Sequence, residues 1–284
     1  MTFWMALIGA AVLWGIIAAG RSQYARRRRE RALSKPFPDE WETILERSVA
    51  LYRRLPDPCK IELRKRILLF LDEKRFEGCG GLTLTDEIRL TVAAQACLLV
   101  MNRPTRSALY PRLSSILVYP EVYMAPEWIP LDGELYMETT GVQSGESWQE
   151  GMVVIAWKDA KRESKSTKGP YNVVIHEFAH QLDQESGWAD GTPILRNRRQ
   201  YERWQTISRR EFSRLREEGG GSDSPLNDYG GLDPAEFFAV ATETFFQDSR
   251  RMADGIPELY DQLKDYYGLD PAEWNKPQGG NGRG

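Results

Sequence analysis

The stretch that decides the fold is residues 173–183, VVIHEFAHQLD, which contains both histidines of the 284-residue chain, His176 and His180. Apolar residues precede and separate the histidines, as in a helix with one buried face. On such a helix, residues four apart project side by side, so the two imidazoles can bind one tetrahedral Zn²⁺. Glu177 lies about 100° round the helix from His176, where it can reach water at the metal without being a ligand. The spacing predicts zinc-dependent hydrolysis with Glu177 as the catalytic base.

The two histidines leave a zinc site incomplete, and the chain has no third histidine. A helix predicted at 233–246 offers two carboxylates, Glu236 and Glu243, which lie seven residues apart and therefore on one face. A buried carboxylate needs a partner, and a metal ion is one. We expect Glu236 to be the third ligand, and Glu243 to be either the ligand in its place or a partner of a ligand histidine. A zinc site without catalysis and a chance pair of histidines remain the alternatives.

The hexapeptide GLDPAE occurs twice, at 231–236 and at 268–273. Each copy places Asp at an N-cap, Pro at the first helical position and Glu at the third, which predicts a helix start. Glu236 therefore has a second interpretation, as a capping-box residue. The second copy is followed by Trp-Asn-Lys-Pro and not by an apolar run, so Glu273 is not expected to bind metal.

The N-terminus has an apolar run at 3–19, followed by seven basic residues and one acidic residue between 21 and 35. The run is long enough for a short membrane-spanning helix, and the cations after it favour a cytoplasmic location of the rest. We therefore expect a transmembrane anchor at 1–20, a basic juxtamembrane linker at 21–38, and a single-pass protein of a bacterial inner membrane. A secretory signal peptide is the alternative, although its cations would precede the apolar run.

The body that follows is acidic, with 31 basic and 40 acidic residues from position 36 onward. This charge excludes a nucleic-acid-binding role, which would need a basic surface. The three cysteines have no metal-binding spacing, and their small odd number favours a reducing compartment over a disulfide framework. We expect one domain at 39–275 and a disordered tail at 276–284.

The rest of the chain predicts an α+β fold that is predominantly helical with a small sheet. Short β-branched and aromatic runs indicate strands at 116–119 and 152–157. Apolar spacing and start signals predict helices at 41–52, 61–76, 85–101, 172–182, 199–216 and 233–246, and from 257 onward.

Three stretches in order resemble the Mlc titration factor A family of bacterial zinc metallopeptidases: GVQSGESWQEGMVVIAW (141–157), VVIHEFAHQLD (173–183) and DPAEFFAVATETFF (233–246). The resemblance implies a zincin-like peptidase domain that acts on peptides or proteins. It also implies one zinc ion per chain on His176, His180 and Glu236, with Glu177 as base. The family's association with a transcriptional repressor leaves an alternative, a zinc-stabilised regulatory protein that binds such a partner.

The metalloprotease domain of anthrax lethal factor is similar around its third ligand, where a tyrosine lies seven residues before Glu-Phe-Phe-Ala. Tyr229 has this position relative to Glu236, so the similarity implies that Tyr229 stabilises the oxyanion. An ordinary core or surface tyrosine is the alternative. By similarity to zincins, the strand at 152–157 is either an edge strand that pairs with substrate or an ordinary strand. Asp183 either orients a ligand imidazole or caps a helix end.

Overall fold

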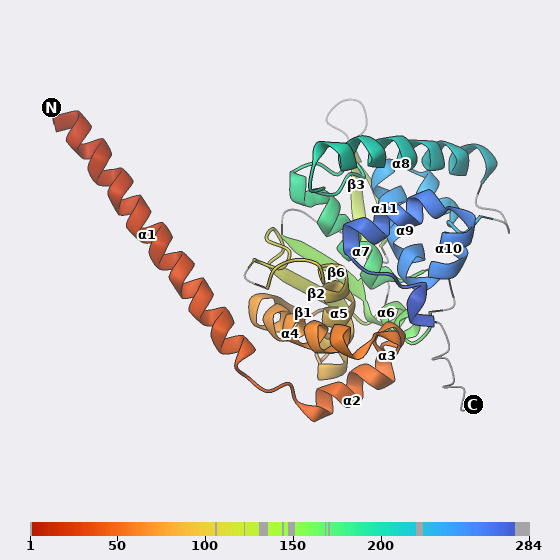
Figure 1. Cartoon of the computed structure of the whole chain (residues 1–284), viewed down its shortest axis with the longest axis horizontal. Coiled ribbons are helices and arrows are strands. Elements are labelled where there is room, and N and C mark those ends of the chain that lie inside the picture. Colours follow the sequence, from red (N-terminus) through yellow and green to blue (C-terminus); the bar gives the residue numbers. More distant parts are fainter. Residues whose placement is uncertain are drawn as a thin grey trace, which may run out of the picture.

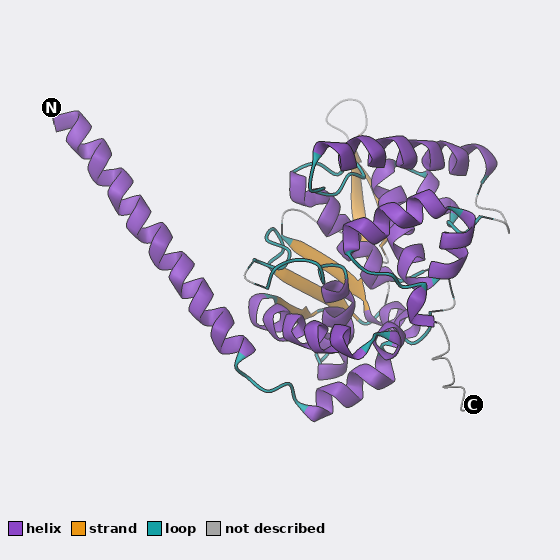
Figure 2. Cartoon of the chain, in the orientation of Figure 1, coloured by secondary structure: helices purple, strands orange, loops and turns teal. Residues whose placement is uncertain are grey.

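A computed structural model describes residues 2–275 except 106, 122, 131–135, 144, 147–150, 168, 170 and 220–223. The tail predicted to be disordered, 276–284, lies outside the described residues. Helices form most of the body and surround a small sheet, as predicted for a predominantly helical α+β protein (Figure 1, Figure 2).

The N-terminal half of the body is mostly helical, and its helices pack against one another. Its helices are α2 (Asp39–Ser48), α3 (Ala50–Arg54), α4 (Asp57–Glu73) and α5 (Asp86–Leu98). The helix predicted at 41–52 is divided at Val49, whose backbone is extended and whose side chain is buried. Thr85 is the N-cap of α5, since its hydroxyl accepts a hydrogen bond from the Ile88 N–H. Ordinary capping chemistry thus sets where α5 begins.

The sheet contains, in order, β1 (Arg75–Gly78), β2 (Ser115–Tyr119), β6 (Met152–Ala156) and β5 (Gly145–Glu146). The first three strands are parallel, and β5 is antiparallel to β6. Ile116 and Val118 on β2 pair with Val153 and Ile155 on β6, and all four side chains are buried. A second, two-stranded sheet pairs β3 (Tyr123–Pro130) with β4 (Tyr136–Gln143) in antiparallel register.

The strands predicted at 116–119 and 152–157 are therefore present, with one correction to their arrangement. β6 is not the edge of its sheet, because β5 pairs with it through Gly145↔Ile155 and Glu146↔Val154. The helix predicted at 61–76 is also too long. Its last residues leave α4 and form β1, which pairs with β2.

The C-terminal half supplies the helices around the candidate site. They are α6 (Trp157–Ser164), α7 (Val173–Asp183), α8 (Arg198–Glu218), α9 (Pro234–Gln247), α10 (Ser249–Gly255) and α11 (Pro257–Tyr267). Helix α7 lies between the sheet and α9 (Figure 1). Phe178 on α7 packs its ring 5.8 Å from Phe70 of α4 and 5.0 Å from Tyr110. The helix that carries both histidines is thus embedded in the core.

The N-terminal helix α1 (Thr2–Leu33) requires a correction. Within the described part of the chain, no helix is long and apolar enough to cross a membrane, so the predicted single-pass inner-membrane localisation is wrong. Helix α1 runs without interruption from the apolar run into the arginine-rich residues 21–33. This basic end lies against the body, where Arg28 and Arg29 form ion pairs of 2.7 Å with Asp72 and Glu73. The arginines predicted to lie in a juxtamembrane linker thus belong to a helix that contacts α4.

Candidate active site

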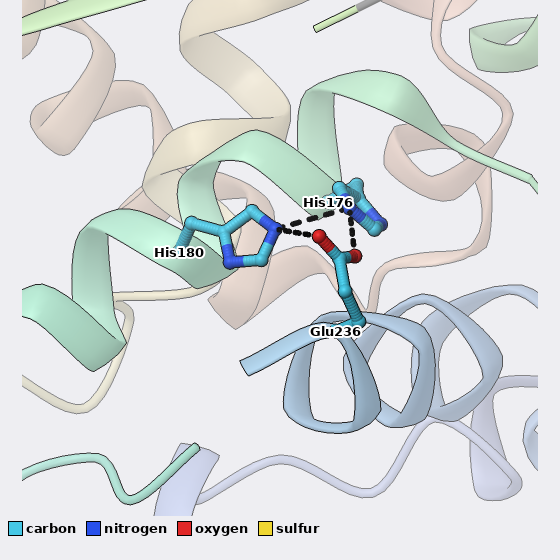
Figure 3. Close-up of side chains that lie close together, drawn as sticks. All are labelled: His176, His180 and Glu236. Atoms are coloured by element: carbon cyan, nitrogen blue, oxygen red, sulfur yellow. Dashed lines mark hydrogen bonds and ion pairs between the residues drawn. The ribbon is translucent and has the colours of Figure 1, made fainter. Parts of the chain in front are cut away.

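The two histidines project from consecutive turns of α7 toward one point (Figure 3). Asn172 begins this helix, and its side-chain oxygen accepts a hydrogen bond of 3.1 Å from the Ile175 N–H. The Nε2 atoms of His176 and His180 lie 3.1 Å apart. Only 13% and 12% of the two side chains are exposed. The local sequence thus produces the paired imidazoles that the spacing predicts, and both are mostly buried.

Glu236 reaches the same point from the first turn of α9 (Figure 3). Asp233 caps this helix, with its Oδ1 accepting from the N–H groups of Ala235 at 2.8 Å and Glu236 at 3.0 Å. The Glu236 carboxylate lies 3.0 Å from Nε2 of His176 and 3.5 Å from Nε2 of His180. One helix supplies two imidazoles and the other supplies one carboxylate.

The three side chains fit a metal ion. One ligand atom from each lies within 4.8 Å of the others, and within the described ranges this is the one such group of His, Cys, Asp or Glu. Tetrahedral zinc at about 2.0–2.1 Å from its ligands separates those ligands by about 3.3 Å. The Nε2 atoms of the two histidines lie 3.1 Å apart, and the two oxygens of Glu236 lie 3.0 Å from His176 and 3.5 Å from His180, which is close to this value. Two imidazoles and a carboxylate are also a donor set that leaves room for water on zinc.

Glu243 lies outside this cluster and contacts the far side of one imidazole. Its Oε1 is 2.7 Å from Nδ1 of His176, and its Oε2 accepts a hydrogen bond from the Asn172 N–H. The Nδ1–H of His176 therefore donates to Glu243, which fixes the ring with Nε2 directed toward Glu236 and His180. Of the two carboxylates proposed from the sequence, Glu236 converges on the histidines and Glu243 orients one of them.

The carboxylates and imidazoles of the site change one another's pKa. Burial alone lowers the pKa of His176, but hydrogen bonds to Glu236 and Glu243 raise it well above the usual value. Burial alone raises the pKa of Glu236, but hydrogen bonds from His176 and His180 lower it to about 2. Glu236 is therefore an anion at neutral pH, as a metal ligand must be.

Glu177 is the buried acid of the site, with 3% of its surface exposed. Burial raises its pKa to about 7, although the nearby His176 and His180 oppose this rise. Its Oε2 has no hydrogen-bond partner among the residues that the structure describes. A carboxylate with a pKa near 7 and an unused oxygen is able both to take up and to release a proton.

Tyr229 borders the site from the short helix η2 (Asp228–Gly231). Its ring centroid lies 5.9 Å from that of His176, and about half of the side chain is exposed. Asn227 positions it, with the side-chain oxygen accepting from the Tyr229 N–H at 2.9 Å and the amide donating to the Tyr171 hydroxyl at 3.0 Å. Burial raises the pKa of Tyr229 to about 12, so the hydroxyl keeps its proton at neutral pH.

Asp183 differs from both sequence interpretations. The side chain is fully buried at the end of α7, and its Oδ2 accepts a 3.0 Å hydrogen bond from the Gly191 N–H. Burial raises its pKa to about 6. Asp183 thus fastens the loop that follows α7 to the end of the helix.

Asn172 is a residue of the site that the sequence analysis assigned only to a helix. Its amide donates a 2.6 Å hydrogen bond to Oε1 of Gln95 on α5, and Gln95 donates in turn to Ser164 on α6 at 2.7 Å. Together with the Asn172 N–H bound to Glu243, these bonds connect the site to two further helices. The signal was available, because Asn directly before an apolar helical run is a typical N-cap.

The comparisons with known proteins agree with this geometry. The family model described as glucose-regulated metallo-peptidase M90 matches residues 23–268, so the chain belongs to this metallopeptidase family. Its relatives include Mlc titration factor A of Klebsiella pneumoniae, 30% identical over 227 residues, which cover 78% of this chain and 83% of the relative. The same factor of Pectobacterium atrosepticum is 31% identical over 229 residues, with the same coverage. An uncharacterized Synechocystis protein, slr2042, is 37% identical over 257 residues, 89% of this chain and 93% of that protein. The predicted resemblance to the Mlc titration factor A family is confirmed.

Proposed function

We propose that the protein is a zinc-dependent peptidase in which His176, His180 and Glu236 hold one zinc ion and Glu177 is the general base. The observation that carries this proposal is the convergence of three ligand atoms from two helices beside a buried carboxylate. Membership of a metallopeptidase family supports a peptide or protein as the substrate.

The residues of the chain divide the work of peptide hydrolysis. When bound, zinc supplies Lewis acidity, which lowers the pKa of water and polarises a peptide carbonyl. Glu177 accepts a proton from the attacking water on its carboxylate and then donates that proton to the leaving amine nitrogen. Its pKa of about 7 suits both transfers. Glu243 holds the His176 ring, and the Tyr229 hydroxyl donates a hydrogen bond to the developing oxyanion.

The test is the Glu177→Gln variant, which keeps the shape of the side chain and removes its basicity. We expect one zinc ion per chain by metal analysis, as in the wild type, and a loss of peptide cleavage of about 10²–10⁴-fold. Glu217→Gln, at an exposed position near the end of α8, is the matched control and keeps full activity. Retained cleavage in Glu177→Gln would remove this residue from the mechanism, and a wild type without zinc would overturn the proposal as a whole.

A second candidate function takes its support from the name of these relatives, Mlc titration factor A. In this proposal zinc stabilises the fold, and the main activity is capture of a protein partner such as a transcriptional repressor. Binding would then survive in Glu177→Gln and fail after changes of surface residues away from the metal. Co-purification of a partner with both the wild type and Glu177→Gln distinguishes this function from peptide cleavage.

A further inference from the structure

We propose that Gly191 is a positioning residue that sets the separation of α7 and α9 and so keeps Glu236 within reach of the two histidines. The residue lies in the loop between α7 and α8 and does not touch the metal ligands itself. The inference rests on the proposed zinc site.

Gly191 is a junction between three helices. Its N–H donates to Asp183 Oδ2 at the end of α7, over 3.0 Å. Its carbonyl accepts a 3.0 Å hydrogen bond from the indole N–H of Trp204 on α8, whose side chain is buried. Its Cα lies against Pro234, the first residue of α9. Both backbone polar groups of this buried residue are thus used for connections between elements.

The contact with Pro234 leaves no room for a side chain at position 191. A Cβ added to Gly191 would lie 2.1 Å from the carbonyl oxygen of Pro234 and 2.6 Å from its carbonyl carbon. The obstructing atoms belong to the backbone, so no rotamer change relieves the clash. The φ angle of +73° also favours glycine at this position.

The position of Glu236 makes this contact matter for the metal. Pro234 lies two residues before Glu236 on α9. Glu243 lies seven residues after Glu236 on the same face of the helix, and it contacts His176 through a 2.7 Å hydrogen bond. Glu236 therefore lies between two connections of α9 to α7. If a side chain at position 191 displaces Pro234 by about 1 Å while the hydrogen bond of Glu243 to His176 keeps the later part of α9 in place, the Glu236 carboxylate moves relative to the histidines. Metal–ligand distances tolerate only about 0.2 Å.

The main experiment compares Gly191→Ala with Gly219→Ala. Gly219 has almost the same φ, +71°, but the nearest atom to its added Cβ is Asp228 Oδ1 at 3.6 Å, an ordinary contact. Both variants place an alanine at a positive φ, and only Gly191→Ala brings the new Cβ against the backbone of α9. We expect zinc affinity, measured by competition with a chromophoric chelator, to fall about 10–100-fold in Gly191→Ala and less than about twofold in Gly219→Ala.

A second pair of variants tests the junction without a steric clash. Trp204→Phe keeps an aromatic ring and removes the N–H that binds the Gly191 carbonyl. Trp41→Phe is its control, because it removes a comparable 3.1 Å hydrogen bond to Asp86, remote from the site. We expect a loss of zinc affinity of about tenfold for Trp204→Phe and none for Trp41→Phe.

The outcomes separate this inference from the proposed function. Wild-type zinc affinity in a folded Gly191→Ala, or an equal loss in Gly219→Ala, would overturn the role of Gly191. Circular dichroism and thermal unfolding show whether Gly191→Ala folds. If it does not fold, the zinc affinity of Trp204→Phe is the test, and wild-type zinc affinity in that variant overturns the inference. A wild type that binds no zinc would instead refute the proposed function.

Discussion

The two copies of GLDPAE have different structures and different neighbours. In the first copy, 231–236, Asp233 turns its carboxylate onto the N–H groups of its own helix, and Glu236 points at the histidines. In the second copy, 268–273, the Asp270 carboxylate accepts a hydrogen bond from the Glu273 N–H, and it also contacts α11, where it accepts a 2.6 Å hydrogen bond from the Tyr260 hydroxyl and forms a 2.5 Å ion pair with Lys264.

The helix start predicted at the second copy produces only a turn and the short 3-10 helix η3 (Glu273–Asn275), and no α-helix follows it. The first copy is followed by an apolar run that α9 buries against α7, whereas the second is followed by Trp-Asn-Lys-Pro. Capping signals lower the cost of starting a helix, but burial of an apolar face supplies most of its stability. The same six residues thus place a glutamate beside the two histidines in one copy and contact α11 in the other.

The largest difference between the copies is expected from the variants Glu236→Gln and Glu273→Gln. Loss of the ligand carboxylate should lower zinc affinity more than about 100-fold and abolish the thermal stabilisation that zinc gives the wild type. Glu273 is exposed, and its replacement should change neither quantity. Zinc titrations and thermal unfolding with and without chelator measure both. Equal effects of the two variants would contradict the distinction.

An intermediate difference is expected from the variants Asp233→Ala and Asp270→Ala. Asp233→Ala removes the N-cap of α9, which costs about 1 kcal/mol of unfolding free energy and, because the first turn frays, about tenfold in zinc affinity. Asp270→Ala also destabilises the fold, since Tyr260 loses its acceptor, but it leaves zinc affinity unchanged. Urea unfolding of the metal-free proteins and zinc titrations check the two outcomes. A loss of zinc affinity in Asp270→Ala would show that the copies are coupled.

The smallest effect concerns the pH dependence of stability. The pKa of Glu236 in the folded chain is about 2, below its ordinary value of 4.5. Since the folded pKa is the lower one, the ionised carboxylate stabilises the fold above about pH 4.5, and this contribution disappears as the pH falls toward about 2. Between about pH 5 and pH 3, the free energy of unfolding of the metal-free wild type should therefore fall by about 1 kcal/mol more than that of Glu236→Gln. Urea unfolding at several pH values measures this difference, and a constant difference would refute it.

The sequence was sufficient for the parts of the site that depend on local periodicity. The i, i+4 spacing of His176 and His180 and the apolar run after Asp233 both determine which side chains share a helical face. Strand β1 escaped prediction because its four residues include one large apolar side chain, Phe76, and continue the helical pattern of α4. Its conformation comes from pairing with β2, which lies about 40 residues later in the chain.

Glu243 as a partner of a ligand histidine was one of the alternatives from the sequence, but the other contacts that orient the site connect distant parts of the chain and were not predicted. Glu243 binds the Asn172 N–H from 71 residues away, and nothing in the spacing of either residue identifies the other. The carboxylate of Asp183 was assigned to an imidazole or a helix cap, but a loop glycine is its partner. For α1, the apolar composition of 3–19 suggested a membrane anchor, and it did not reveal the ion pairs at the other end of the helix.

Those ion pairs join only the C-terminal end of the long helix α1 to α4. The helix has 32 residues and is about 48 Å long, and in Figure 1 its N-terminal end lies far from the body. Arg29 and Glu73 are mostly buried where they meet, whereas the Arg28 side chain is about half exposed to solvent. A tilt of about 5° at this joint swings the distant tip by about 4 Å. Because dissolved ions weaken exposed charge pairs more than buried ones, a rise in ionic strength weakens the Arg28–Asp72 pair at this contact before the Arg29–Glu73 pair.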